Sequence, residues 1–160
     1  MPIRLDPIDW RILKELQADG RITNVALAER VGLSPPPCLR RVRALEDAGL
    51  ISGYTVLLDE KALGFPVQAF ALVGLHSQSE ADLRAFENRV LAAPYVREAH
   101  MLSGESDYIL ACVAPDLEAF HEFVLRELTA WPNVASVKTH LAIRRAKRDP
   151  GLPFGGGGKG

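Results

Sequence analysis

The sequence lacks the features that mark membrane, secreted and metal-binding proteins. No apolar stretch approaches the roughly 20 residues needed to cross a bilayer, and the N-terminus lacks the basic and then apolar pattern of a signal peptide. Only two cysteines, Cys38 and Cys112, occur among 160 residues, far apart and without CxxC spacing. Since the four histidines also lack metal-ligand spacing, we expect free thiols and no metal site. A soluble cytoplasmic protein is the expectation.

Excess positive charge, which is typical of proteins that bind nucleic acids, is absent as well. The formal net charge is −1, and residues 62–143 hold five Lys and Arg residues against ten Asp and Glu residues. This middle region should repel nucleic acid. Residues 1–60 are close to neutral, and a short basic run, RRAKR, lies at 144–148. Any binding to nucleic acid must therefore depend on local clusters of charge.

Residues 1–58 have the pattern of a small helical domain. Apolar residues at helical spacing predict three short helices. Their first residues lie near Pro7, Thr23 and Ser34, and they end before Gly20, Gly32 and Gly49. Only residues 32–34 separate the second helix from the third, which matches the turn of a helix-turn-helix. Residues 51–58 then read as a strand, because the run Tyr-Thr-Val favours extended backbone.

The third predicted helix, Ser34–Ala48, gathers positive charge. Its apolar stripe leaves three arginines on the outer side: Arg40, Arg41 and Arg43. Arginine can grip a guanine edge or a phosphate at two points, and a recognition helix places such side chains in the major groove. The plain alternative is a solvated helix face, balanced by the acidic residues near its end. The short turn before the helix and the strand after it favour DNA reading, as in winged helix-turn-helix domains.

Three prolines, Pro35–Pro37, follow Ser34 at the start of this helix. Proline costs little in the first turn, where the N–H groups lack intrahelical acceptors, but it disfavours helical geometry in the residue before it. The sequence therefore allows a first turn that starts with Ser34 as N-cap, or later, at Pro36 or Pro37. Because prolines remove amides that would bind a phosphate, we expect phosphate contacts from side chains and from the Cys38 N–H. The candidate DNA contacts are Ser34, Pro36, Pro37, Cys38, Arg40, Arg41 and Arg43.

A hinge at residues 59–66, which holds charged residues, glycine and proline, precedes a second domain at 67–145. Its apolar patterns predict strands at 67–75, 96–102, 108–113 and 134–143, and helices at 80–93 and 116–129. This order is typical of the ferredoxin-like βαββαβ arrangement. Residues 146–160 form a basic and then glycine-rich tail, whose glycine-rich end we expect to be disordered. The predicted fold class is α+β: a winged helix-turn-helix domain (1–58) joined by a linker strand to a ferredoxin-like domain.

Together these patterns resemble the Lrp/AsnC family, the leucine-responsive and asparagine-responsive transcription regulators. The shared N-terminal motifs are the opening LDPIDWRIL, the run VGLSPPPCLRRVRALE and the segment GLISGY. In the second domain, GESDY at 104–108 stands in place of the family's G-x-x-D-Y signature. The resemblance covers about residues 5–143, in order and without a large gap. The family commonly has a polar residue where Pro36 stands and often an acidic one where Arg40 stands, so the operator sequence does not carry over.

The resemblance implies a DNA-binding regulator whose loop at 103–108 binds an amino-acid effector between dimers. The implied effector residues are Gly104, Glu105, Asp107, Tyr108, Thr139 and His140. In this interpretation, Asp107 accepts from the ammonium group, while Thr139 or loop amides bind the carboxylate. Without the resemblance, the loop reads as a solvated turn and His140 as a structural residue. The family also implies homodimers, built through the second domain's sheet and the linker strand, that assemble further, often into octamers.

Three other functions are open at this point. An enzyme would need a nucleophile–base pair, a phosphate loop or a metal set beside Glu105 and Asp107, and the sequence offers none of these, so we expect no catalysis and no cofactor. A sensing module without DNA binding would not need the three arginines of the third helix. A DNA-organising protein with little sequence preference would differ in its competitor ratio and salt dependence.

Overall fold

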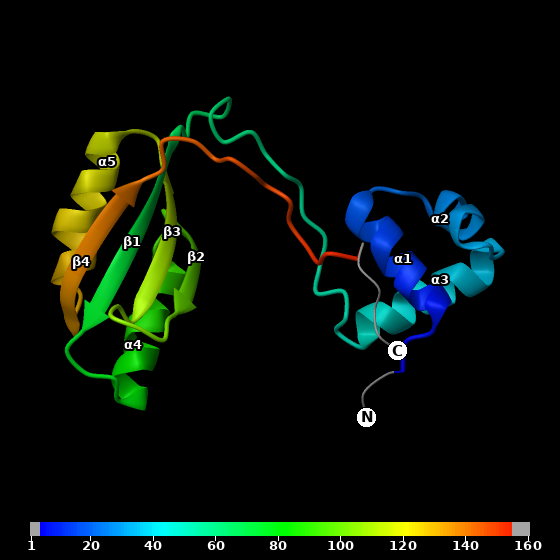
Figure 1. Ribbon diagram of the computed structural model, residues 1–160, viewed down its shortest axis with the longest axis horizontal. Coiled ribbons are helices and arrows are strands. Elements are labelled where there is room, and N and C mark those ends of the chain that lie inside the picture. The colour runs from blue at the N-terminus through cyan, green and yellow to red at the C-terminus, as the bar shows by residue number, and fades with distance from the viewer. Residues whose placement is uncertain (1–3, 155–160) are drawn as a thin grey trace. The chain divides into compact units, whose positions relative to one another are not determined.

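The computed structural model describes residues 4–154, which form two compact units (Figure 1). The first unit extends to Leu57 and includes the segment that begins at Arg148, and the second is Leu58–Lys147. The glycine-rich end at 155–160, which we expect to be disordered, lies outside the described residues. None of the described helices combines the length and apolar character of a membrane span. Nor do the described residues contain a group of three or more potential metal ligands.

Three helices build the first unit: α1 (Pro7–Ala18), α2 (Asn24–Val31) and α3 (Pro35–Asp47). Asp6 and Asp9 form a capping box at the start of α1. At the start of α2, the Thr23 hydroxyl accepts from the Ala26 N–H. Gly32 ends α2 with φ 76°, a left-handed conformation that suits glycine, and turns the chain directly into α3. The predicted helix-turn-helix is confirmed.

The core of this unit is small, and no aromatic ring is buried in it among the described residues. Its buried residues are Ile12, Leu27, Ala28, Val31, Cys38, Val42 and Leu45. Polar contacts between helices add to it. The Arg11 guanidinium donates to the Val31 carbonyl at 3.0 Å, and Arg30 pairs with Glu15 at 2.9 Å. The helices are therefore joined by side-chain hydrogen bonds as well as by apolar packing.

One local prediction for this unit is wrong, and of the predicted starts of the third helix the earlier one is confirmed. Residues 51–58 form no strand and have irregular backbone, and Tyr54 donates its hydroxyl to Glu46 of α3 at 2.8 Å. Helix α3 begins at Pro35 and is not delayed, although the Ser34 hydroxyl accepts no capping bond. The reason is that the prolines at the first three helical positions have no N–H to donate to it.

The second unit is an antiparallel sheet with helices on one face. Its strands are β1 (Val67–Leu75), β2 (Val96–Met101), β3 (Tyr108–Ala114) and β4 (Val134–Leu141), in the order β2-β3-β1-β4. Alternate residues of β1 and β3 are buried against Phe86 of α4 (Glu80–Ala92) and Phe120 of α5 (Leu117–Glu122). The ferredoxin-like order is confirmed.

The segment predicted as one helix, 116–129, contains three types of helix in succession: α, π and 3-10. Asp116 is the N-cap of α5, which is followed by a π-helical segment, Phe123–Glu127, and a 3-10 turn, Leu128–Ala130. The wider π turn changes the helical phase, so that Phe123, Val124 and Leu128 are all buried against the sheet.

The opposite face of the sheet is covered by no helix of the described residues. Phe70 on β1 pairs with Ala111 on β3 and with His140 on β4, so these side chains form one row across this open face. Phe70 is 42% exposed, which is unusual for a phenylalanine in the middle of a sheet.

Candidate DNA-reading helix and effector loop

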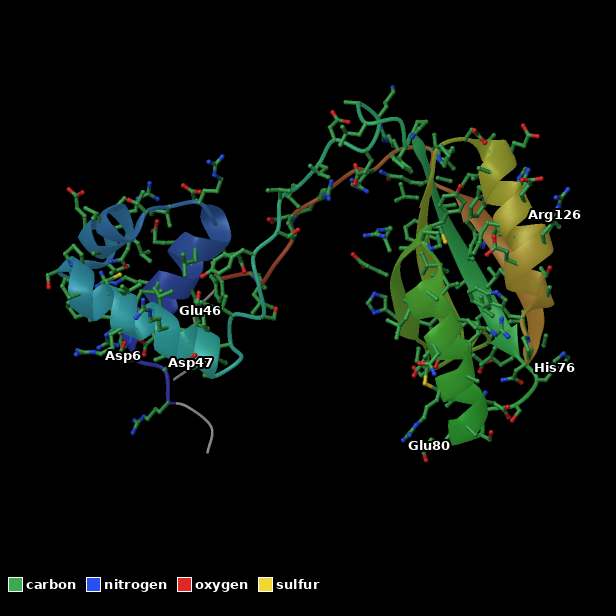
Figure 2. The ribbon with its side chains drawn as sticks, turned by 180° about the vertical axis from the view of Figure 1, so that it is seen from behind. Asp6, Glu46, Asp47, His76, Glu80 and Arg126 are labelled. Atoms are coloured by element: carbon green, nitrogen blue, oxygen red, sulfur yellow. The ribbon has the colours of Figure 1, made fainter. Side chains whose placement is uncertain are left out.

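The outer face of α3 carries two arginines that are available for binding. Arg40 and Arg43 are exposed and line a shallow depression with Pro36 and Leu39. Within residues 4–154, neither arginine forms an ion pair or a side-chain hydrogen bond. The acidic pair Glu46 and Asp47 lies at the C-terminal end of α3 (Figure 2). Arg40 thus lies in the N-terminal half of α3 and Arg43 in the C-terminal half, where Asp47 lines the same depression. Arg40 is therefore the arginine nearer the part of a recognition helix that contacts bases.

Arg41 has a different environment. One of its terminal nitrogens lies 2.7 Å from an Asp6 oxygen and 2.7 Å from an Asp9 oxygen, which ties α3 to the start of α1. The pKa of Asp6 is lowered, first by the hydrogen bond from the Asp9 N–H and then by the bond from Arg41. Because two carboxylates already neutralise its guanidinium, Arg41 orients α3. We therefore remove it from the residues proposed to contact DNA.

Cys38 is also unavailable at the surface of α3. Its side chain is 0% exposed, and burial raises the pKa of its thiol. Its N–H, the expected phosphate donor, bonds to the Ser34 carbonyl at 3.3 Å. The cause is the early start of α3, which gives this amide an intrahelical acceptor. Of the remaining candidates, Ser34 and Pro36 are exposed and Pro37 is half-buried.

Asp107 fixes the loop between β2 and β3 to the end of β1. One carboxylate oxygen accepts from the Leu75 N–H at 2.6 Å and the other from the Gln78 side chain at 2.6 Å. The Asp107 N–H donates to the Val73 carbonyl, and its carbonyl accepts from the Leu102 N–H. One donor is a backbone N–H and the other a side-chain amide, and the Asp107 carboxylate has two further lone-pair sites.

Tyr108 belongs to the core. The residue is 3% exposed, its ring centroid lies 4.7 Å from that of Phe86, and its hydroxyl donates to Glu87 at 2.7 Å. Burial and, next, the Glu87 carboxylate raise the pKa of Tyr108 to about 12. We therefore assign Tyr108 a structural role in holding β3 against α4, and not a direct contact with an effector.

Gly104 and Glu105 are exposed at the tip of the loop, where a Cβ on Gly104 would meet no atom within 4 Å. Thr139 and His140 lie elsewhere. Thr139 pairs with Ala71, and His140 is directly opposite Phe70 on the open face. Adjacent strand residues point to opposite faces, and among the described residues no hydrogen bond joins either one to the loop. The structure therefore does not bring the six candidates together within one chain.

Two residues missed in the sequence complete this region. Gln78 donates to Asp107, and Asn133 clamps the intervening segment: its amide accepts from the Ser77 N–H and donates to the Ser77 carbonyl, both at 2.8 Å. Asn133 itself has φ 72°, a left-handed conformation that asparagine tolerates. No spacing in the sequence signals these contacts, because the partners lie 29 and 56 positions apart.

A helix-turn-helix with exposed arginines, followed by a βαββαβ domain with an anchored acidic loop, defines a ligand-responsive DNA-binding protein. Comparison with known families agrees. Residues 5–52 match the winged helix-turn-helix DNA-binding domain, and residues 68–152 match the Lrp/AsnC ligand-binding domain. The chain belongs to the Lrp/AsnC family of transcription regulators, and it is not an enzyme.

Individual relatives share both domains. The chain is 59% identical to a leucine-responsive regulatory protein of Rhizobium meliloti over 145 residues, which cover 91% of this chain and 93% of the relative. It is 37% identical to the transcriptional regulator AzlB of Bacillus subtilis, over 96% of this chain and 98% of that protein. A crystal structure of a Neisseria meningitidis transcriptional regulator in complex with L-Met superposes with a TM-score of 0.89 at 38% identity, over 95% and 98% of the two chains.

Proposed function

We propose that the chain is a sequence-specific regulator that binds operator DNA through α3 and changes its assembly and DNA binding when an amino acid binds to its second unit. Arg40 and Arg43, which are exposed and form no ion pair within residues 4–154, carry the DNA-binding part of this proposal. Their guanidinium groups reach base edges or phosphates, with Ser34 and Pro36 beside them at the start of the helix. The proposed place of action is the cytoplasm, where the regulator would meet its DNA.

The Asp107 loop supports an amino-acid effector. A free amino acid presents an ammonium group, and the charged, incompletely paired Asp107 carboxylate is a suitable acceptor for it. Exposed backbone at Gly104 and Glu105 provides N–H groups for the carboxylate of the effector. The relative from Neisseria meningitidis was crystallised with L-Met, which favours a ligand of this chemical class.

The open face of the sheet supports a homodimer. It presents Phe70, Leu72 and Ile109 without a covering helix among the described residues, and burial of such a face is favourable. Dimers would then place two copies of α3 on two half-sites. Because Thr139 and His140 lie apart from the loop within one chain, we propose that they reach an effector bound by another subunit. Further assembly to octamers follows the family resemblance.

A thermal-shift screen of the common amino acids, followed by gel shifts with the protein's own promoter, tests this function. A ligand at about 100 times its Kd should stabilise the folded state by about 2.7 kcal/mol. We expect one or a few amino acids to raise the Tm and to change the operator shift. If no amino acid alters either readout while the protein still binds DNA, the effector part of the proposal is wrong.

A further inference from the structure

The described part of the C-terminal segment is bound to the outer face of α1. The Gln17 side chain donates to the Leu152 carbonyl at 2.7 Å and accepts from the Leu152 N–H at 2.8 Å. The Phe154 ring meets Trp10 edge-on, with centroids 6.0 Å apart and planes at 67°. Trp10 and Gln17 lie about two helical turns apart and therefore on the same face of α1. The Gln17 amide and the Trp10 indole thus form a site that binds an extended segment at two positions.

The bound segment, Pro150–Phe154, has a sequence that suits this site. Gly151 adopts φ 103°, and a Cβ there would lie 2.5 Å from the Gln17 side chain. The backbone conformation therefore favours glycine, and a Cβ would displace the Gln17 amide from its position beside Leu152. Prolines on either side restrict the unbound chain, which lowers the entropy lost on docking. The Leu152 side chain is 65% exposed, so its contribution comes from the backbone.

This contact changes how the chain connects its two units. The chain leaves the first unit at Leu57 and re-enters it at Arg148, beyond the last strand of the second unit. Within the second unit, the outgoing and returning stretches run side by side, and Arg145 pairs with Glu60 at 3.3 Å (Figure 1). The helix-turn-helix is thus joined to the second unit at two places in the sequence.

We propose that the outer face of α1, defined by Trp10 and Gln17, is a docking site for the chain's own segment Pro150–Phe154. The docked segment is a second tether between the helix-turn-helix and β4. The regulatory consequence rests on the proposed function. Because the tether continues from the strand that carries Thr139 and His140, effector binding at that strand is transmitted to α1 as well as through the hinge at 59–66.

The docking itself is tested without DNA or effector, by amide hydrogen exchange on the full chain. The Leu152 N–H should be protected in the wild type, and Gly151→Ala or Gln17→Ala should speed its exchange on the order of tenfold, the factor expected for the loss of two net hydrogen bonds. Leu152→Ala is the matched control and should leave exchange at this amide nearly unchanged. Exchange at the rate of an unstructured peptide in the wild type would overturn the docking.

Acrylamide quenching provides an independent readout. The protein has two tryptophans, of which Trp131 is 9% exposed and Trp10 is 47% exposed, so quenching reports mainly on Trp10. Phe154→Ala should increase quenching, whereas Leu152→Ala should not. Equal quenching in Phe154→Ala and the wild type would contradict the aromatic contact.

The tether is tested by removing residues from Pro150 onward. The shortened chain should bind operator DNA with unchanged affinity in the absence of effector, but the effector should change that affinity several-fold less than in the wild type. An undiminished effector response would overturn the tether. If the full chain shows no effector response at all, the proposed function fails, while hydrogen exchange at Leu152 still decides the docking.

Discussion

The two units of this chain are stabilised in different ways. The second unit buries a continuous core that includes Phe86, Phe120, Phe123 and Trp131 between its sheet and its helices. Among its described residues the first unit buries aliphatic side chains and one cysteine. Ion pairs between helices and a docked segment from residues 150–154 add to this core. A small core gives little apolar burial, so the orientation of α3 depends on polar contacts such as that of Arg41.

This difference has a functional meaning. The second unit has the larger buried core, and its candidate binding surfaces are the Asp107 loop and the open face of the sheet. The first unit presents the arginines of α3 to DNA. Its internal ion pairs occupy Arg41 and leave Arg40 and Arg43 exposed. Each tryptophan lies in a different unit, Trp10 in the first and Trp131 in the second, so fluorine-labelled tryptophan can follow both units in one sample.

Truncation of an aromatic core residue should produce the largest difference in stability between the two units. Phe120 is 1% exposed, and Phe120→Ala should lower the free energy of unfolding of the second unit by about 3–5 kcal/mol, through lost burial and the cavity left behind. Fluorine NMR during urea titration should show the Trp131 transition moving and the Trp10 transition nearly unchanged, at fixed protomer concentration. Leu91→Ala, at a site 83% exposed, is the control and should move neither. Equal shifts at both tryptophans would mean that the units unfold as one.

The charge of Asp107 should matter more for the effector than for the fold. Asp107→Asn retains an acceptor for the Leu75 N–H but removes the charge, so effector affinity measured by calorimetry should fall at least about tenfold, as for loss of a charge-assisted hydrogen bond. DNA binding without effector should stay intact. Gln78→Ala removes one bond to Asp107 and keeps the charge, so its effect should be smaller. Wild-type effector affinity in Asp107→Asn would show that the carboxylate only positions the loop.

Loss of the Arg41 contacts should weaken the first unit alone. Arg41→Ala leaves Asp6 and Asp9 without their shared partner, so the Trp10 transition should move to lower urea while the Trp131 transition stays in place. The effect should be well below that of Phe120→Ala, because the ion pairs are partly open to solvent. An unchanged Trp10 transition would show that these ion pairs contribute nothing to the unit.

The smallest expected effect is on the pH dependence of the stability of the first unit. The pKa of Asp6 in the folded protein lies below its ordinary value of 3.8, so folding favours the ionised carboxylate. Its stabilising contribution is complete above the ordinary value and is lost as the pH falls through the lowered one. In Asp6→Asn, the stability of the first unit should therefore depend less on pH below about 4, as measured by urea titrations followed at Trp10. Parallel pH profiles for variant and wild type would contradict this role.

The sequence predicted the fold well because its signals are local. Gly32 between two amphipathic helices, and the change from helical to alternating patterns after residue 66, both follow from residues close in the chain. The site was predicted less completely, because its details depend on distant partners. On a helical face Arg40, Arg41 and Arg43 look alike, and only the fold brings Asp6 and Asp9 to Arg41, 35 and 32 positions away.

The same reason explains the other differences. Residues 51–58 have strand propensity, but propensity alone does not make a strand, and this segment has irregular backbone. The protection of the Cys38 amide depends on where a proline-rich helix starts, which propensity does not decide. The segment at 150–154 contacts Gln17 across 135 positions, and the sequence contains no pattern that would pair the two.

The salt dependence of operator affinity tests most directly whether Arg40 and Arg43 bind DNA while Arg41 positions α3. It should be measured for the wild type, the double variant Arg40→Ala/Arg43→Ala, and Arg41→Ala at temperatures where all are folded. The double variant should lose affinity on the order of a hundredfold, and each phosphate contact removed should flatten the salt slope by about one. Arg41→Ala should keep the wild-type slope. A wild-type slope in the double variant, or a flattened slope in Arg41→Ala, would contradict the account.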